Sequence, residues 1–397
     1  MALRAHNSAV RFVALLLVFV SGCLAGEVTL QTRTNYVFKN DGIRVNNRFP
    51  GARVSDCERI GEGRYRILIR PENFPINRSP WYAFKVRSRT KQTIQIALRY
   101  HNAFHRYHPR ISEDGALWNR LADDQIKISP RRTEAMLTLK VGPDPLWVAG
   151  QECIGIREIR DWMKELQARG ARRKKIGLSK GERALHGLQF GSRTSTNMLI
   201  IVSRQHPPEV TGSIGLMSFV ERLLPDDEQA AAFREHVGVM LVPLMNPDGV
   251  KEGHWRHNLA GVDLNRDWKN FGQPETRAVR DWIENTLKER GARPLLFLDF
   301  HSTYRDVFYT QGDQHPTTPP DFTKRWLKAI GDRLPDYQVN RSASHNVDKP
   351  TSKAWAYERF RCPAITYEYG DHTDRELIRR QATVAAEEMM QLMLEFL

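Results

Sequence analysis

The sequence has few cysteines, and none of them is arranged as a metal knuckle. Only four occur in 397 residues, at Cys23, Cys57, Cys153 and Cys362, and no two form a Cys-x-x-Cys pair. This excludes a small disulfide-built scaffold and argues against a thiolate zinc site. If Cys23 is removed or lipidated, an odd number remains, so at least one thiol stays unpaired within the chain. We expect small buried hydrophobic residues with at most one disulfide.

Internal repeats, low-complexity tracts and long hydrophobic runs beyond the N-terminus are also missing from the sequence. This argues against a repeat array, a disordered chain and a transmembrane span in the mature protein. The 397 residues, 41% of them hydrophobic and 27% charged, match an ordinary globular protein of two or three domains. The sequence indicates no oligomeric state.

Acidic residues are outnumbered by basic ones. The chain has 46 Asp and Glu against 60 Lys and Arg, which gives a formal net charge of +14 and favours acidic partners. The only dense basic run, at 172–175, is interpreted as a solvated helix end or loop, because no nucleic-acid motif accompanies it. We therefore expect no nucleic-acid partner.

Residues 1–25 have the layout of an export signal. Arg4 and Arg11 precede the apolar run Phe12–Val20, which is too short to span a membrane permanently. Two processing routes fit the residues that follow. Val20-Ser-Gly-Cys23 is similar to a lipoprotein box with Cys23 as lipid anchor, whereas cleavage after Ala25 would release a soluble protein. Both routes predict that the mature chain is exported, to the periplasm or the extracellular space.

Residues 27–141 have the pattern of short, half-buried β-strands. In Ile94–Tyr100, for example, the large apolar side chains occupy every second position. Turn sequences such as Asp41-Gly42 and Asp114-Gly115 separate the expected strands. Several short strands separated by turns predict an antiparallel β-sandwich domain. The following Gly142-Pro-Asp-Pro145 is expected to be a linker.

From residue 150 to 397, buried apolar strands alternate with amphipathic helices. The strands are expected near 198–202, 237–242, 295–300, 307–310 and 364–369. The helices are expected near 156–166, 210–224, 278–287, 322–334 and 373–397. The alternation predicts an α/β fold in which helices cover both faces of a mostly parallel mixed sheet.

Three candidate metal ligands lie at the ends of two of these strands. His206 and Glu209 follow one strand, and His301 ends another. Ligands collect where the strands of an open α/β sheet end. Two His and one carboxylate are typical of a catalytic zinc with one position left for water. Pro207 and Pro208 exclude a regular helix through the first pair, although they suit the first turn of one.

Further carboxylates could support a metal at this position. A carboxylate that accepts the second ring N–H of a ligand histidine holds its tautomer, and Asp263 or Asp299 could do so. Glu368 ends another apolar strand. A Glu beside a metal-activated water is the expected general base for hydrolysis. Together these residues indicate a zinc-dependent hydrolase.

The order of these motifs resembles a known family. His206-x-x-Glu209, Asn246-Pro-Asp-Gly249, Trp255-Arg256, Val262-Asp-Leu-Asn265-Arg266, His301-Ser302 and Glu368 follow the motifs of the carboxypeptidase A-type zinc carboxypeptidases. The wording Ala260-Gly-Val-Asp-Leu-Asn-Arg266 is most similar to the cytosolic carboxypeptidase branch, which carries a β-sandwich ahead of its catalytic domain. Tyr82–Val86 and Pro109–Gly115 are similar to parts of that sandwich. The resemblance thus covers nearly all of the mature chain.

The resemblance implies a role for each site residue. Zn²⁺ on the three candidate ligands would polarise a water, and Glu368 would take its proton and pass it to the leaving amine. Arg256 would stabilise the oxyanion. Asn265 and Arg266 would bind the terminal carboxylate of a peptide or protein substrate, which would make the enzyme an exopeptidase.

The resemblance also suggests where the terminal side chain is bound. The family often has a tyrosine lid upstream of its catalytic Glu. Counting back from Glu368 by the family's spacing leads to His345 and Asn346, where there is no tyrosine. The nearest tyrosine is Tyr357. A similar count assigns Lys353 and Trp355 to the segment that lines the side-chain pocket. A lysine there favours acidic side chains. We therefore hypothesise a preference for substrates that end in Asp or Glu.

Two other functions compete with a carboxypeptidase. The first is an exported amidase that acts on cell-wall peptides, because these substrates also end in carboxylates. The second is a non-catalytic binding module on the same fold. That second function predicts a missing ligand or a missing base, and the sequence lacks none of them.

Overall fold

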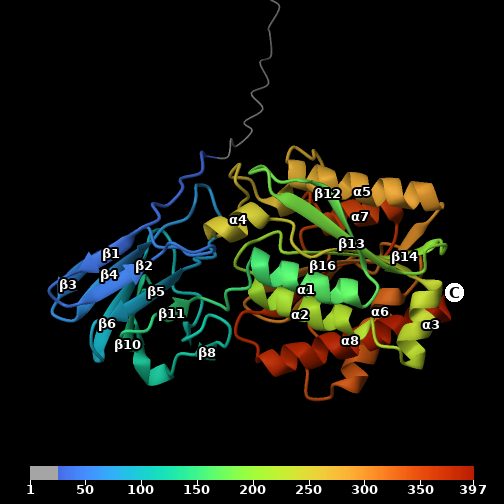
Figure 1. Cartoon of the computed structure of the whole chain (residues 1–397). Helices are drawn as coiled ribbons and strands as arrows, with labels where there is room; N and C mark the ends of the chain where they lie inside the picture. The colour runs from blue at the N-terminus through green and yellow to red at the C-terminus, as the bar shows by residue number, and fades with distance from the viewer. Residues whose placement is uncertain (1–25) are drawn as a thin grey trace, which may run out of the picture.

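The computed structural model describes residues 26–397. The expected export signal and the lipid-anchor candidate Cys23 lie outside these residues. Figure 1 shows a β-sandwich, drawn in blue and cyan, beside a larger α/β region in green to red. Among the helices described, none combines the length and hydrophobicity that a membrane span requires.

Two sheets form the sandwich. The first contains, in spatial order, β1 (Asn35–Phe38), β2 (Ile43–Asn46), β5 (Ala83–Ser88), β11 (Leu146–Ala149), β7 (Arg110–Ser112) and β8 (Asn119–Arg120). The second contains β3 (Asp56–Gly61), β4 (Arg64–Ile69), β6 (Gln92–Tyr100), β10 (Glu134–Val141) and β9 (Ile126–Ile128). Neighbouring strands are antiparallel except β4 and β6, which run parallel. The expected sandwich is confirmed, with this one parallel pair inside it.

The predicted linker at 142–145 is a turn within the sandwich. After it, β11 pairs with both β5 and β7, so the first sheet extends to Ala149. The linker prediction was wrong because Gly and Pro mark tight turns between strands as readily as they mark linkers.

The α/β region is built on an eight-stranded mixed sheet. Its order is β12 (Arg172–Leu178), β13 (Ala184–Gly191), β15 (Gly238–Val242), β14 (Asn197–Ser203), β16 (Arg293–Thr303), β19 (Ala364–Gly370), β17 (Val307–Thr310) and β18 (Arg341–Ala343). The central strands β15, β14, β16 and β19 are parallel to one another. The predicted α/β fold is therefore confirmed.

Helices cover both faces of this sheet. The helices of the α/β region are α1 (Ile156–Ala168), α2 (Val210–Arg222), α3 (Glu228–His236), α4 (Pro247–Glu252), α5 (Pro274–Arg290), α6 (Phe322–Arg333), α7 (Ser352–Phe360) and α8 (Arg375–Glu395). In Figure 1, α5 and α7 lie on one side of the sheet, and α1, α2 and α8 lie on the other. Because both faces are covered, β14 is apolar from Met198 to Val202. Leu199 packs in the cluster of α2 and α8, and Ile200 in that of α5 and α7.

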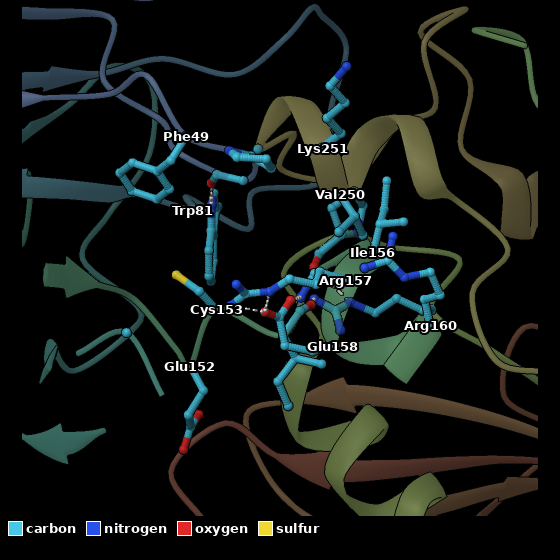
Figure 2. A pocket seen from close by; sticks show the side chains of 18 of the residues that line it. Phe49, Trp81, Glu152, Cys153, Ile156, Arg157, Glu158, Arg160, Val250 and Lys251 are labelled. Atoms are coloured by element: carbon cyan, nitrogen blue, oxygen red, sulfur yellow. Dashed lines mark hydrogen bonds and ion pairs between the residues drawn. The ribbon is translucent and has the colours of Figure 1, made fainter. Parts of the chain in front are cut away.

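The hydrophobic core is continuous between the two regions. One buried cluster contains Tyr65 and Phe84 of the sandwich together with Leu199 and Phe219 of the α/β region. A separate pocket of about 470 Å³ lies at the junction of the two regions, between Trp81 and the start of α1 (Figure 2). The sandwich is thus packed against the α/β region and is not a loosely tethered module.

The basic run at 172–175 is neither a helix end nor a loop. It forms the first part of β12, an edge strand that pairs only with β13 among the described strands and exposes all four charged side chains. The strand was not predicted because four consecutive charged residues show no alternation of apolar and polar side chains. Charged side chains are nevertheless common on edge strands, where they prevent pairing with the edge of another sheet. The strands β13 and β18 and the helices α3, α4 and α7 were likewise not predicted.

The three cysteines within residues 26–397 are unpaired. Cys57 and Cys362 are buried, Cys153 is half-buried, and none of them forms a disulfide in this part of the chain. They behave as small buried hydrophobic residues, as expected.

Candidate metal centre

A tight turn after β14 delivers the first two candidate ligands. Arg204 takes a left-handed backbone conformation, with φ of 56°. Its buried guanidinium donates to the carbonyl of Pro207 at 2.9 Å and to Ser213 Oγ at 2.8 Å. Helix α2 begins only at Val210, so both prolines precede it and Glu209 occupies its N-cap position. The prolines therefore exclude a helix through His206 and Glu209, as predicted.

A glycine brings α2 close to β16. A Cβ on Gly212 would lie 2.5 Å from the carbonyl oxygen of His301, so only glycine permits this approach. Ser302 strengthens the contact, because its Oγ accepts hydrogen bonds from the amide of Gly212 at 2.8 Å and from Thr211 Oγ1 at 2.7 Å. The start of α2 is thereby fixed beside the histidine on β16.

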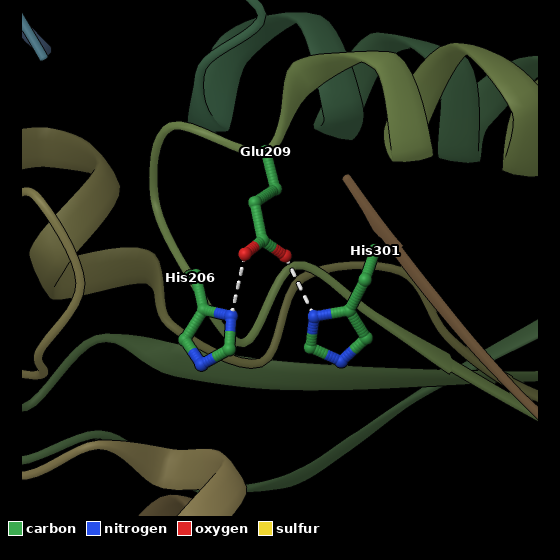
Figure 3. A group of neighbouring side chains, drawn as sticks. All are labelled: His206, Glu209 and His301. Carbon is green, nitrogen blue, oxygen red and sulfur yellow. Dashed lines mark hydrogen bonds and ion pairs between the residues drawn. The ribbon is translucent and has the colours of Figure 1, made fainter. Parts of the chain in front are cut away.

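The three candidate ligands converge on one point (Figure 3). Glu209 Oε1 lies 2.7 Å from His206 Nδ1, and Glu209 Oε2 lies 2.6 Å from His301 Nδ1. All three residues are buried, and one ligand atom from each lies within 4.8 Å of the others. Contacts this short between imidazole and carboxylate need a proton on each Nδ1, and a cation bound between the groups takes the place of those protons.

Carboxylates hold the outer nitrogen of both histidines. His206 Nε2 lies 2.9 Å from Asp263 Oδ1, and His301 Nε2 lies 2.8 Å from Asp299 Oδ2. A proton held on each Nε2 leaves each Nδ1 lone pair for a metal. Two imidazole nitrogens, one carboxylate and adjacent open space match the donor set of a catalytic zinc site. The residues therefore fit Zn²⁺.

Glu368 faces the same point from the neighbouring strand. Parallel β16 and β19 pair so that His301 stands opposite Glu368, which turns both side chains to the same face. Burial raises the pKa of Glu368 above its usual range, and the positive charge of His301 only partly opposes this. Glu368 Oε2 is buried and has no hydrogen-bond partner within residues 26–397. Such an unpartnered carboxyl group is suited to proton transfer.

Arg256 is linked to the centre through Asp263. Its Nε donates to Asp263 Oδ2 at 2.7 Å, and its Nη1 lies 4.0 Å from Glu209 Oε1. Burial alone would raise the pKa of Asp263, but Arg256 and His206 outweigh it and hold this pKa well below its usual range. Asp263 is thus an anion that joins the arginine to the ligand histidine.

A sandwich residue that was not predicted supports the loop of Arg256. Glu72 lies between β4 and β5 and is fully buried. Its Oε2 accepts the amide of Trp255 at 2.7 Å, and its Oε1 accepts those of Arg256 at 2.9 Å and His257 at 2.7 Å. Burial would raise the pKa of Glu72, but nearby His254 and Arg53 keep it below its usual value. The sandwich therefore fixes the main chain that carries Arg256.

Asn265 and Arg266 lie in a short helical turn, Leu264–Arg266, that Asp263 caps. Asn265 is buried, and its Oδ1 accepts the amide of Ser352 at 3.0 Å. Arg266 Nη1 donates to the carbonyl of Asn265 at 2.7 Å, and Arg266 forms no ion pair with any described residue. Both side chains line the cleft of the metal centre.

Lys353 reaches the cleft, but Trp355 does not. Lys353 Nζ donates to the carbonyl of His345 at 2.8 Å, and burial lowers the pKa of Lys353 to about 8. Trp355 packs in the core against Trp268, with 5.0 Å between ring centroids. The prediction for Trp355 was wrong because residues two apart on a helix, here α7, do not share a face.

One cleft of about 140 Å³ contains most of the predicted site. Its lining includes His206, Glu209, Arg256, Asn265, Arg266, His301, Lys353 and Glu368, while Asp263 lies behind His206. His345 and Asn346, where the family's spacing predicts the tyrosine lid, also line this cleft. Tyr357 instead bonds the carbonyl of Pro316, and the tyrosine in the cleft is Tyr309 on β17. The sequence predicted that Tyr309 lies in a strand but did not predict its position in the cleft.

Comparison with known proteins identifies a family for most of the α/β region. The family model described as zinc carboxypeptidase matches residues 159–391. Cytosolic carboxypeptidase 2 of Danio rerio is 33% identical over 119 residues, which cover 29% of this chain and 16% of that protein. The matched segment is therefore a small part of both proteins.

Two solved structures share the fold across both regions. A metallo-carboxypeptidase from Burkholderia cenocepacia matches with a TM-score of 0.73 at 18% identity, covering 89% of this chain and 98% of that one. A metallo-carboxypeptidase from Pseudomonas aeruginosa, solved in complex with (2-guanidinoethylmercapto)succinic acid, matches with a TM-score of 0.71 at 21% identity. That match covers 89% of this chain and 100% of the other. The sandwich is thus part of the shared fold.

Proposed function

This chain belongs to the zinc carboxypeptidase family, and from this premise we propose that it is an exported enzyme that removes C-terminal residues, preferentially acidic ones, from peptides. One observation carries the proposal. His206, Glu209 and His301 converge in a cleft that Glu368 also lines, so ligands and base meet where a peptide end can enter. A zinc-dependent peptide hydrolase needs this combination.

The proposed mechanism divides the work between zinc and the chain. When bound to the three ligands, zinc supplies Lewis acidity to the scissile carbonyl and to the attacking water. Glu368 takes the proton of that water on its unpartnered Oε2 and passes it to the leaving amine. Arg256, held by Asp263 on one side and by the Glu72-bound loop on the other, donates to the developing oxyanion.

The substrate terminus is assigned to Arg266 and Asn265. Arg266 lines the cleft without an ion-pair partner among the described residues, so its guanidinium is available to a carboxylate. A planar guanidinium pairs well with a planar carboxylate, and the amide of Asn265 can add a further donor. Requiring a free C-terminus would make the enzyme an exopeptidase.

Lys353 supports the preference for acidic terminal residues. It lines the cleft, it forms no ion pair with a described residue, and its bonds go to the neutral carbonyls of His345 and Thr310. A buried cation without a counter-ion is stabilised by an incoming carboxylate. We therefore assign the side chain of a terminal Asp or Glu to Lys353.

Peptide cleavage with and without a chelator tests the function. Purified residues 26–397 are incubated with peptides that differ only in the last residue, either Glu, Asp, Leu or Lys, and with the same peptides amidated at the C-terminus. We expect release of the terminal residue only from free termini, fastest for Glu and Asp. A zinc chelator should abolish release, and added Zn²⁺ should restore it.

Three results would contradict parts of the proposal. Equal cleavage of amidated peptides would indicate an endopeptidase, because the terminal carboxylate would then play no role. Cleavage of cell-wall peptide fragments alone would favour the amidase. An unchanged preference for acidic over basic termini after Lys353→Glu would refute the role of this lysine.

Export of the mature chain remains a proposal from the sequence of residues 1–25. Fractionation of bacteria that express the full chain tests it, since an exported protein is found outside the cytoplasm. Comparing Cys23→Ser with the unchanged chain separates the two processing routes. Loss of membrane association in the variant would indicate a lipid anchor, and an unchanged soluble product would indicate cleavage after Ala25.

A further inference from the structure

Two side chains of the sandwich reach the catalytic cleft. Asn77 lies in the loop before β5, Arg106 follows β6, and both line the cleft together with Ser302 and Thr303 of β16. The other lining residues all lie between 206 and 368, in the α/β region. The substrate channel is therefore built across the boundary between the two regions.

Arg106 is held rigidly in this position. Its Nε donates to Asp371 Oδ2 at 2.8 Å, and its Nη1 donates to Ser79 Oγ at 2.9 Å. The guanidinium also lies over the rings of Tyr304, at 4.5 Å, and Tyr107, at 5.0 Å. Arg106 is only 9% exposed, and its Nη2 has no acceptor among the described residues. Nε and Nη1 each make one of these bonds, which leaves Nη2 as the unengaged nitrogen of a residue that lines the cleft.

The surroundings of Arg106 favour a neutral acceptor. Asp371 already balances the charge of the guanidinium, and its buried Oδ1 has no hydrogen-bond partner within residues 26–397. A second carboxylate at this point would be repelled by Asp371, whereas a peptide carbonyl would not. Asn77 is exposed, and its carboxamide can donate to a carbonyl and accept from an amide. This pair of groups suits a peptide main chain.

Arg106 and the residues assigned to the substrate terminus are held by different hydrogen-bond partners. Lys353 bonds His345, and the charges of Lys353 and Arg266 both help burial to lower the pKa of His345. Arg106 instead bonds Asp371, whose amide donates to the carbonyl of Thr303 at 2.8 Å. The terminal residue of the substrate is assigned to Arg266 and Lys353. Arg106 and Asn77 are therefore left for the residues that precede it.

We propose that Arg106 and Asn77 form a subsite that binds the main chain of the peptide on the N-terminal side of the scissile bond. This inference rests on the proposed carboxypeptidase function. It makes the sandwich part of the substrate site and predicts a preference for oligopeptides over the shortest substrates. Because the contacts go to main-chain atoms, the preference is independent of the upstream side chains.

A length series of peptides tests the subsite. The substrates share one C-terminal dipeptide and extend from an N-blocked dipeptide to a pentapeptide, and kcat/KM is measured for each. We expect kcat/KM to rise with length in the unchanged protein. The ratio between long and short substrates should fall about tenfold in Arg106→Gln, the effect of losing one hydrogen bond from a charged donor, and severalfold in Asn77→Ala.

Matched controls keep the test independent of folding. Arg78→Ala changes the residue next to Asn77, which lies over the ring of Phe104 and does not line the cleft, so its length ratio should stay unchanged. Asn77→Ala removes an exposed side chain and does not threaten the fold. A pentapeptide with a reduced, carbonyl-free upstream bond should lose the length advantage, while replacing an upstream Ala by Leu or Glu should not.

The outcomes separate this inference from the function it rests on. Cleavage of the blocked dipeptide by the unchanged protein measures the carboxypeptidase function alone. The subsite is refuted if that protein shows no length advantage, or if Arg106→Gln and Asn77→Ala both keep it. It is also refuted if the advantage follows the charge of the upstream side chain.

Discussion

The α/β region and the sandwich contribute to one cleft in different ways. The α/β region presents its ligands and base where the parallel strands β14, β16 and β19 end side by side. The sandwich contributes from loops, with Glu72 between β4 and β5 and Arg106 after β6. The first region supplies the chemistry, and the second fixes a catalytic loop and extends the binding surface.

The largest expected effect tests whether the chemistry belongs to the α/β region alone. Glu368→Gln keeps the shape of the side chain but cannot accept a proton, so kcat should fall about a thousandfold. Zinc content and the midpoint of thermal unfolding serve as controls, and both should stay close to those of the unchanged protein. Retained turnover by a zinc-loaded variant would remove Glu368 as the base.

The next effect comes from the sandwich. Glu72→Gln leaves one carbonyl oxygen for three backbone amides, and its NH₂ group faces a donor, so the loop of Arg256 should shift. Losing one well-placed oxyanion donor costs about a hundredfold in kcat, and we expect about tenfold to a hundredfold here. The loss should appear in kcat more than in KM, with zinc content unchanged.

Glu62→Gln is the matched control, because Glu62 is an exposed turn residue of the same sandwich. Activity lost equally in both variants would indicate a general loss of stability. Full activity in Glu72→Gln would mean that the sandwich does not position Arg256.

A smaller effect concerns pH and the terminal side chain. Burial lowers the pKa of Lys353 to about 8, so the lysine loses its positive charge as the pH rises through this value. The ratio of kcat/KM for peptides ending in Glu to that for peptides ending in Gln should therefore decline, by about tenfold, between pH 7 and pH 9.5. In Lys353→Met the ratio should be low and flat over this range. The same decline in both proteins would exclude Lys353 as its cause.

The smallest effect on activity is expected at the edge of the sheet. Lys174→Val on β12 removes a charge that protects an exposed strand edge, so self-association should rise while kcat stays unchanged. Lys288→Val on α5 is the control, because it removes the same charge from an exposed helix position. Equal self-association of the two variants in sedimentation would show that strand geometry is irrelevant.

The sequence was most informative where backbone periodicity and chemistry coincide. His206 follows a buried apolar strand, and His301 and Glu368 lie near the ends of two others; parallel strands place such ends at one edge of the sheet. The need for a carboxylate on the second ring nitrogen of a ligand histidine suggested Asp263 or Asp299, and the structure has a contact from each, Asp263 to His206 and Asp299 to His301. These features could be predicted because local pattern determines where the side chains point.

Features that depend on packing between distant loops could not be predicted. Glu72, Asn77 and Arg106 lie outside any periodic pattern, and their positions depend on how the sandwich docks on the α/β region. Buried glutamate and arginine residues are uncommon, and nothing in their neighbours along the chain signals burial. The predictions for Trp355 and for residues 172–175 failed for a related reason. The first depended on which face of α7 the side chain occupies, and the second on whether β12 lies at an exposed edge of the sheet.

The pairing of β16 with β19 also determines where this fold can change in length. His301 and Glu368 stand opposite each other only in the observed register, which also sets Leu298 against Ile365. If one residue were inserted within β19 before Glu368, the side chains before the insertion and those after it could no longer both keep their present faces of the sheet. Insertions in the connection at 313–318, by contrast, leave both strands intact. Length variation among relatives should therefore accumulate between these strands and be absent from them.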